Sequence, residues 1–121
     1  MTLKEFYAAV GGDYADAMGR LMNEKMAKRF LRKFPKDPSY TELSQAMQAA
    51  DYDTAFRGAH TLKGVAYNLS LTELGDRASA LTEALRPGHE EQRIPAELQK
   101  LLAAVTAADQ AVMAALEELE E

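Results

Sequence analysis

The amino-acid sequence predicts an all-α protein, an antiparallel up-and-down four-helix bundle with short additional N-terminal helices. Ala, Leu, Met, Glu, Lys and Gln are abundant while β-branched residues are few and dispersed, a composition that favours helices over strands. Four longer segments carry apolar residues at intervals of three and four, which is the spacing of an amphipathic helix. Short connections rich in Pro and Gly separate them, and helices with one apolar stripe and short loops are typical of such a bundle.

The first two helices are defined by capping residues and by residues that break helices. Thr2 and Glu5 form a capping box for a short first helix, which the Gly-Gly pair after residue 10 ends. Asp13 can cap a second helix that reaches about Phe34, where the sequence FPKDP resists continuation. The first helix is too short to stand alone, so we expect it to pack at one end of the bundle.

The next two helices follow closely along the chain. Ser39 and Glu42 form a second capping box for a helix that ends at about Ala50. Either Asp51 or Asp53 then caps the following helix, because both precede a segment with helical spacing of apolar residues.

The C-terminal half is expected to hold two further helices. Ser70 and Glu73 form a third capping box, and Leu69 and Leu74 are spaced to form its hydrophobic staple. The helix that follows covers about 71–85 and ends at the sequence RPGHEEQRIP, whose last proline opens the final helix.

Length and charge limit the classes of function. A chain of 121 residues suits one domain, residues 1–121, and can bury an apolar core without disulfides, which the absence of cysteine excludes. The net charge of −5 disfavours nucleic acid as a partner, because phosphates require a positive surface. Neither a signal sequence nor a membrane span is evident. We therefore expect a cytoplasmic monomer that binds neither nucleic acid nor membrane.

One of the two histidines, His60, falls in the middle of the helix that follows Asp51 and Asp53. The apolar positions of this helix cluster on one side: Tyr52, Ala55, Phe56, Ala59, Leu62, Ala66 and Leu69. His60 lies roughly 120° from the centre of that stripe at about 100° per residue, so we expect it on the outside. Gly64 and Arg57 lie one turn from it on the same face, and Lys63 lies between it and the edge of the core.

Gly64 is informative because a glycine in a helix interior costs roughly 1 kcal/mol relative to alanine. Its missing side chain leaves the imidazole of His60 open to a folded partner. A neutral imidazole nitrogen can attack a phosphoryl group, whose oxygens Lys63 and Arg57 can neutralise. Singly, a helix histidine is usually a solvated side chain and a helix glycine can serve close packing. The joint pattern His-x-x-Lys-Gly favours a reactive site, although periodicity alone does not name phosphate as the group transferred.

These residues resemble the signature of the histidine-containing phosphotransfer (HPt) domain family, which is close to Ala-His-x-Leu-Lys-Gly-x-Ala and here reads AHTLKGVA. The likeness covers about residues 43–86, from LSQAMQAADYDTAFRGAHTLKG to LTELGDRASALTEALR. It implies that His60 accepts a phosphoryl group from the aspartyl phosphate of one receiver domain and passes it to the aspartate of another. Lys63 would then carry the family's electrostatic role and Gly64 its access role.

The resemblance also implies the partners and the cofactors. Response-regulator receiver domains and a hybrid histidine kinase would be the partners, and the receiver would supply magnesium, so neither a cofactor nor a metal site is expected here. Such domains do not bind ATP, and the sequence has no Gly-rich phosphate loop. We expect Arg57, Thr61 and Tyr67 to belong to the partner-binding surface.

Some positions leave alternatives open. Tyr67 stands where the family often has a small residue, and its ring can either form part of the docking surface or narrow access to His60. Ser70 stands where the family often has glycine, which its capping box explains. The basic segment KMAKRFLRKF, residues 25–34, is interpreted as a solvated face that complements the helix dipole, with steering of an acidic receiver as the alternative.

Two other functions stay open at this point. The chain can be the phosphoacceptor domain of a chemotaxis-type histidine kinase, phosphorylated by a separate ATP-binding domain. It can also be a helical scaffold that lacks phosphotransfer and uses the same surface for docking. His89, in a loop beside Glu90 and Glu91, is expected to be merely solvated.

Overall fold

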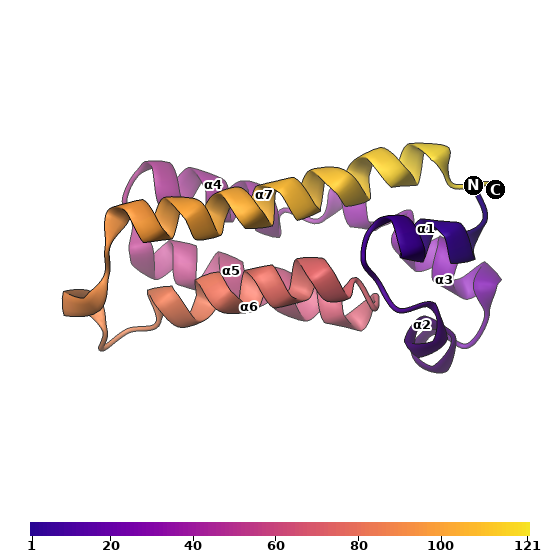
Figure 1. The fold of residues 1–121 in the computed structure, drawn as a ribbon, viewed down its shortest axis with the longest axis horizontal. Helices are drawn as coiled ribbons and strands as arrows, with labels where there is room; N and C mark the ends of the chain where they lie inside the picture. Colours follow the sequence, from indigo (N-terminus) through magenta and orange to yellow (C-terminus); the bar gives the residue numbers. More distant parts are fainter.

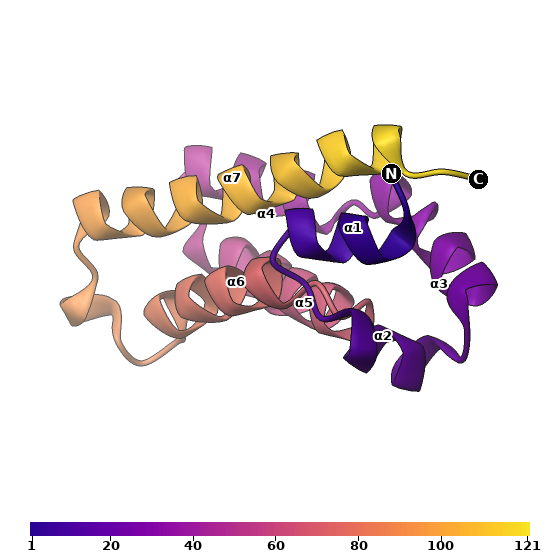
Figure 2. The same cartoon turned by 45° about the vertical axis from the view of Figure 1, so that its right-hand side comes forward.

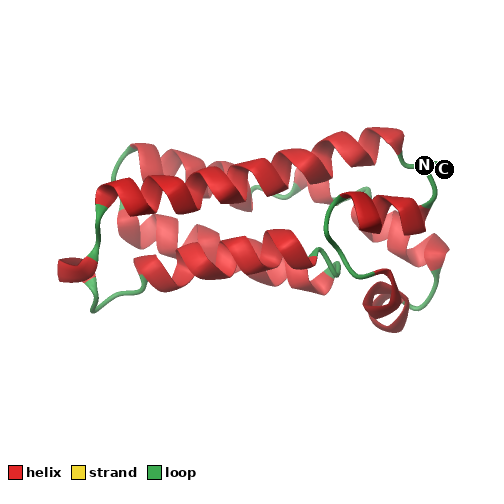
Figure 3. Ribbon diagram, in the orientation of Figure 1, coloured by secondary structure: helices red, strands yellow, loops and turns green.

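The computed structural model describes all 121 residues, which form helices and loops without any β-strand (Figure 3). The seven α-helices are α1 (Leu3–Ala9), α2 (Tyr14–Leu21), α3 (Glu24–Leu31), α4 (Ser39–Gln48), α5 (Tyr52–Asn68), α6 (Thr72–Leu85) and α7 (Pro95–Glu118). Two short 3-10 helices, η1 (Phe34–Lys36) and η2 (Glu90–Gln92), lie in the connections before α4 and before α7. The all-α class predicted from the sequence is therefore confirmed.

The helices α4, α5, α6 and α7 lie side by side along the long axis of the molecule (Figure 1). The short helices α1, α2 and α3 gather at one end, near the C-terminal end of α7, and both chain termini lie at that end. The same arrangement is visible after a rotation of 45° (Figure 2). Helix α5 packs against both of its neighbours in sequence, α4 and α6, so the central histidine helix has a neighbour on each side.

One apolar core joins all of these helices. Every α-helix contributes buried hydrophobic side chains to a single cluster, and the largest fully buried ones include Phe6 and Tyr7 of α1. The hydroxyl of Tyr7 donates a buried hydrogen bond of 2.8 Å to the carbonyl oxygen of Leu69 at the end of α5. The N-terminal helices are therefore tied to the histidine helix by burial and by a hydrogen bond. None of the helices combines the length and the apolar character needed to span a membrane.

Asp109 of α7 is an acidic residue buried beside this apolar core. It is only 8% exposed, and its carboxylate takes part in no hydrogen bond or ion pair. It lines a cavity of about 90 Å³ together with Asp37 and Tyr40. Burial, with a smaller contribution from the charge of Asp37, raises the pKa of Asp109 from 3.8 to about 6.

Several expected helix starts are confirmed. The capping box of Thr2 and Glu5 is present with both of its hydrogen bonds. Asp13 caps α2 by accepting a hydrogen bond of 2.9 Å from the backbone of Asp16. Asp51 rather than Asp53 caps α5, and a proline opens α7. The starts of α1, α2 and α5 depend on side chains that bond within three residues, and that of α7 on a proline, which is why the sequence reveals them.

The prediction of one continuous second helix is wrong. Helix α2 ends at Leu21, and Met22 adopts a φ of +77°, which a continuous α-helix does not allow. Asn23 then starts α3, its side chain accepting a hydrogen bond of 2.9 Å from the backbone of Met26. Met22 is 79% exposed, so this apolar residue sits at the corner rather than in the core. The break allows α2 and α3 to pack separately against the end of the bundle (Figure 2).

The predicted capping box of Ser39 and Glu42 is also wrong. Ser39 is already the first residue of α4, and Pro38 before it makes no side-chain cap. The carboxylate of Asp37 accepts the hydrogen bond from the backbone N–H of Ser39, at 2.9 Å. The helix start is therefore satisfied from two residues upstream, as in an Asx turn.

The capping box and hydrophobic staple predicted at Ser70 are wrong as well, because α6 has Leu71 at its N-cap position. Ser70 takes a φ of +58°, in the left-handed region that favours glycine, and its Oγ donates a hydrogen bond of 2.7 Å to Asp16. Glu73 instead pairs with Arg77 one turn further along α6, at 2.8 Å. The serine thus fixes the turn between α5 and α6 to the N-terminal helices rather than capping α6.

Candidate functional site

Helix α5 presents His60 on its solvent side. The buried face of α5 consists of Ala55, Gly58, Ala59, Leu62 and Ala66. His60, Thr61 and Gly64 are all exposed, as helical spacing predicted for the histidine. The imidazole therefore lies outside the core, on a helix that is held from both sides.

Two glycines of α5 play different parts in its packing. A Cβ atom on Gly58 would come within 3.1 Å of the backbone of Leu43, so the missing side chain allows α4 to approach closely. A Cβ atom on Gly64 would meet nothing within 4 Å. Close packing within the chain explains Gly58 and does not explain Gly64. The packing role of Gly58 could have been inferred from the sequence, because this glycine lies on the apolar stripe of the helix.

Tyr67 is held against α6. A Cβ atom on Gly75 would lie 2.4 Å from the Tyr67 ring, so the ring occupies the space above this glycine. The Tyr67 hydroxyl donates a hydrogen bond of 2.7 Å to Oδ1 of Asp76, and this bond is the main reason that the pKa of Tyr67 is raised. The ring thus lies across the α5–α6 interface and is not free to swing over the histidine.

The imidazole of His60 stacks on Phe56, one turn earlier in α5. The two ring centroids are 6.1 Å apart and the ring planes differ by 12°. The guanidinium of Arg86, at the end of α6, lies 5.5 Å from the centroid of the same Phe56 ring. Arg86 in turn forms two hydrogen bonds with the carboxylate of Glu83, at 2.7 and 3.1 Å. These three neighbours were not predicted as site residues.

The two basic residues expected near His60 differ in their surroundings. Lys63 is half-buried, and no carboxylate lies within 4.0 Å of its ammonium, although its charge contributes to the lowered pKa of Glu83. Arg57 is exposed and donates a hydrogen bond of 3.2 Å to Oγ1 of Thr54, toward the start of α5. Lys63 is therefore the basic residue that faces the α6 side of the site.

A groove runs beside the C-terminal half of α5, on the side of α3. Its volume is about 210 Å³, and its lining residues are Phe30, Lys33, Phe34, Asp37, Val65, Asn68 and Leu69. Phe30 is 37% exposed, and the Lys33 ammonium lies 5.5 Å from the centroid of its ring. This end of the basic segment therefore lies close to the exposed face of α5.

The remainder of the basic segment faces the end of α7. Arg32 donates hydrogen bonds to the carbonyl oxygens of Leu116 and Leu119, at 2.8 and 2.7 Å. Lys28 lies 3.7 Å from the carboxylate of Glu120. These two residues complement the C-terminal end of α7, where carbonyl groups lack helical partners and the helix dipole is negative.

The sequence of the helices around His60 matches the model of a known protein family. The family model of the Hpt domain matches residues 25–120, which is most of the chain and runs from the second residue of α3 to beyond the end of α7. The chain belongs to the Hpt domain family. The resemblance predicted from AHTLKGVA is therefore confirmed, and membership implies histidine phosphotransfer in phosphorelays, in which Hpt domains interact with receiver domains and kinases. Neither the curated proteins nor the solved structures gave a match.

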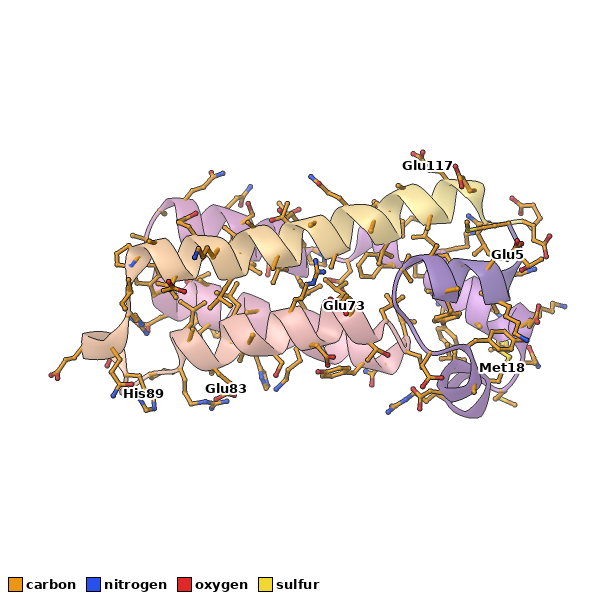
Figure 4. All side chains as sticks on the ribbon, viewed as in Figure 1. Glu5, Met18, Glu73, Glu83, His89 and Glu117 are labelled. Atoms are coloured by element: carbon orange, nitrogen blue, oxygen red, sulfur yellow. The ribbon has the colours of Figure 1, made fainter.

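The region that matches the Hpt domain contains both histidines, and their surroundings differ. His60 lies at the centre of a long helix, stacked on Phe56 and one turn from the open Gly64. His89 lies in the connection between α6 and α7, directly before η2 (Figure 4). It shares a pocket of about 340 Å³ with Glu83 and Arg93. Of the two, only His60 lies within a long helix and beside a glycine that leaves open space.

Proposed function

We propose that this Hpt domain is a phosphoryl carrier, which accepts a phosphoryl group on His60 from a receiver-domain aspartate and passes it to another. The supporting observation is that His60 is exposed beside a glycine for which packing within the chain gives no reason. A glycine in the middle of a helix costs roughly 1 kcal/mol, so a role in access accounts for its presence. The domain carries the group and does not itself use ATP.

The transfer needs an unprotonated imidazole nitrogen with a clear line to phosphorus. Its lone pair forms the N–P bond while the bond from phosphorus to the aspartyl oxygen breaks, and the released carboxylate keeps that electron pair. Stacking on Phe56 fixes the orientation of the ring, and Lys63 neutralises charge on the phosphoryl oxygens. The receiver's Mg²⁺ would supply the remaining charge stabilisation, as in other phosphoryl transfers.

We propose the exposed face of α5 as the docking surface for receiver domains and for a hybrid histidine kinase. Thr61 and Arg57 lie on that face, and the groove formed by Phe30 and Lys33 borders it. Tyr67 contributes as a fixed wall at the α6 side rather than as a lid. A partly exposed aromatic residue next to a positive charge suits a partner whose reactive site is acidic.

We also propose the topology of the bundle, the extent of the domain, its oligomeric state and its location. The helices α4 to α7 form an antiparallel up-and-down four-helix bundle, with α1 to α3 as additional N-terminal helices. Residues 1–121 act as one domain, supported by the single apolar cluster that includes all seven helices. The domain works as a monomer in the cytoplasm.

Transfer from a labelled receiver tests this function. The purified chain would be mixed with a receiver domain whose aspartyl phosphate carries ³²P, and the acid-labile label on the chain would be measured. We expect label on the wild type and on His89→Gln, and none on His60→Gln. Label only from a chemotaxis-type kinase domain would assign the chain to that kinase class instead. No label from any receiver or kinase would leave the docking scaffold as the function.

A further inference from the structure

The contacts between α5 and α6 place Glu83 beside the histidine site. At one end of the interface Tyr67 meets Gly75 and Asp76, and at the other Phe56 meets Arg86. The two helices are joined by a tight turn and run in opposite directions (Figure 1). Residues between these contacts therefore lie at matching heights along the two helices. His60 and Lys63 lie between them on α5, and Glu83 lies one turn before Arg86 on α6.

The Glu83 carboxylate holds Arg86 by two hydrogen bonds, at 2.7 and 3.1 Å. This orientation keeps the guanidinium over Phe56, on which His60 also stacks. Both side chains of the ion pair are about half exposed, at 59% for Glu83 and 44% for Arg86. Exposed pairs of this kind contribute little to stability, so a nearby group of higher charge can separate them.

The positive charge of Lys63 also acts on the Glu83 carboxylate. The pKa of Glu83 is lowered mainly by its hydrogen bonds from Arg86, with further contributions from the charges of Lys63 and His89. Glu83 is therefore the anion that the cations around His60 face while the histidine is free.

We propose that Glu83 is a positioning residue, which holds Arg86 beside His60 by their ion pair until a phosphoryl group on the histidine replaces the carboxylate as the anion that Arg86 and Lys63 face. This inference rests on the proposed phosphotransfer at His60. A phosphoryl group carries more charge than a carboxylate and has three acceptor oxygens, so it competes well for both cations. Glu83 then loses its partners and repels the group, which limits how strongly the domain retains its phosphate.

Glu83 would therefore shift the equilibrium of the phosphoryl group away from His60 and toward the receiver aspartate. When the N–P bond forms on His60, the aspartyl oxygen leaves with its electron pair, and no atom of Glu83 takes part in that exchange. The carboxylate acts only through charge, by lowering the stability of phosphohistidine relative to aspartyl phosphate. Such a balance suits a carrier that must both receive and release the same group.

Glu83→Gln tests the inference, with Glu73→Gln as the matched control. Glu73 belongs to a similar ion pair on α6 but lies toward α7, whereas Glu83 lies at the side away from α7 (Figure 4). Each chain would be equilibrated with a phosphorylated receiver, and the ratio of phosphohistidine to aspartyl phosphate would be measured at low and high salt. Thermal melting of each variant would check the fold.

We expect Glu83→Gln to raise the ratio roughly two- to fivefold at low salt, because the repelling charge is gone and Arg86 is released from its ion pair. The increase should shrink at high salt, an electrostatic response that a purely structural change would not show. Glu73→Gln should match the wild type. An unchanged or lowered ratio in Glu83→Gln, with the wild type fully active, would overturn this role for Glu83. Absence of label on the wild type would instead overturn the proposed function itself.

Discussion

The ring of Tyr67 lies directly over Gly75, and its hydroxyl donates a hydrogen bond of 2.7 Å to Asp76. This contact holds the ring against α6, which supports the proposal that Tyr67 forms a fixed wall of the docking surface rather than a lid over His60. It also fixes the alignment of α5 against α6. The position of Arg86 and Glu83 relative to His60 therefore depends on Gly75, which lies about three helical turns before Arg86 on α6.

Gly75→Ala should destabilise the protein, because the new Cβ atom would lie 2.4 Å from the Tyr67 ring. The ring must move, and its hydrogen bond to Asp76 is lost or bent. Overpacking of this kind costs about 1–3 kcal/mol, which urea unfolding can measure. Tyr67→Ala in the same chain should restore part of the loss, since it removes the clash. Wild-type stability in Gly75→Ala would show that the ring is not held as described.

Gly64→Gln should slow phosphoryl transfer while leaving the fold intact. Nothing lies within 4 Å of the added Cβ atom, and glutamine favours a helix more than glycine does. The free energy of unfolding is therefore expected to stay equal or rise by up to about 1 kcal/mol. Transfer would be followed by the rate of label appearance from a phosphorylated receiver.

Gly58→Ala provides the matched control for that variant. Its Cβ atom would press on the backbone of Leu43 at 3.1 Å, so this variant should lose stability. If Gly64→Gln unfolds as readily as Gly58→Ala, Gly64 serves packing after all. If it melts normally and transfers at the wild-type rate, the access role is wrong.

Lys63→Ala should slow transfer on the order of tenfold, the effect of losing one interaction with a charged group. The loss should be smaller than in His60→Gln, which removes the acceptor altogether. Lys100→Ala, on the exposed surface of α7, is the control for a general change in net charge. A rate in Lys63→Ala equal to that of the control would remove the lysine from the mechanism.

Asp109→Asn should stabilise the protein at neutral pH. The folded state raises the pKa of Asp109 from 3.8 to about 6, so this group binds its proton more tightly when folded. Its contribution to stability is then fully present below about pH 3.8 and is lost as the pH rises through 6. Above that window the buried carboxylate costs roughly 2 kcal/mol, which the neutral amide avoids.

The difference in unfolding free energy between Asp109→Asn and wild type isolates this effect from other titrating groups. Glu5, Asp16 and Asp51 have lowered pKa values, so they oppose the trend, but they are common to both chains. We expect the difference to grow between pH 4 and pH 7, by roughly 2 kcal/mol in urea unfolding. A difference independent of pH would mean that Asp109 titrates normally in the folded chain.

Signals within one helix allowed much of the fold and the position of His60 to be predicted. Thr2, Asp13 and Asp51 cap their helices through bonds to residues three positions away, and the outward position of His60 follows from helical periodicity alone. The break at Met22 was hidden because apolar spacing continues across it. An exposed methionine at a corner has the same sequence signature as a buried one.

The remaining features depend on contacts between distant segments. Ser70 fits a capping pattern by sequence, but its hydroxyl bonds to Asp16, 54 positions earlier in the chain. The approach of Arg86 to Phe56 requires the alignment of α5 and α6, which no single helix specifies. The site around His60 was therefore predicted only for residues on α5 itself.

A phosphoryl carrier of the kind we propose should hold its phosphoryl group on His60. The most direct measurement is to react the chain with a phosphorylated receiver, digest it at neutral pH and locate the modified residue by fragmentation mass spectrometry. We expect phosphohistidine at His60 and an unmodified His89. Modification at His89 or at any other residue, with His60 free, would contradict it.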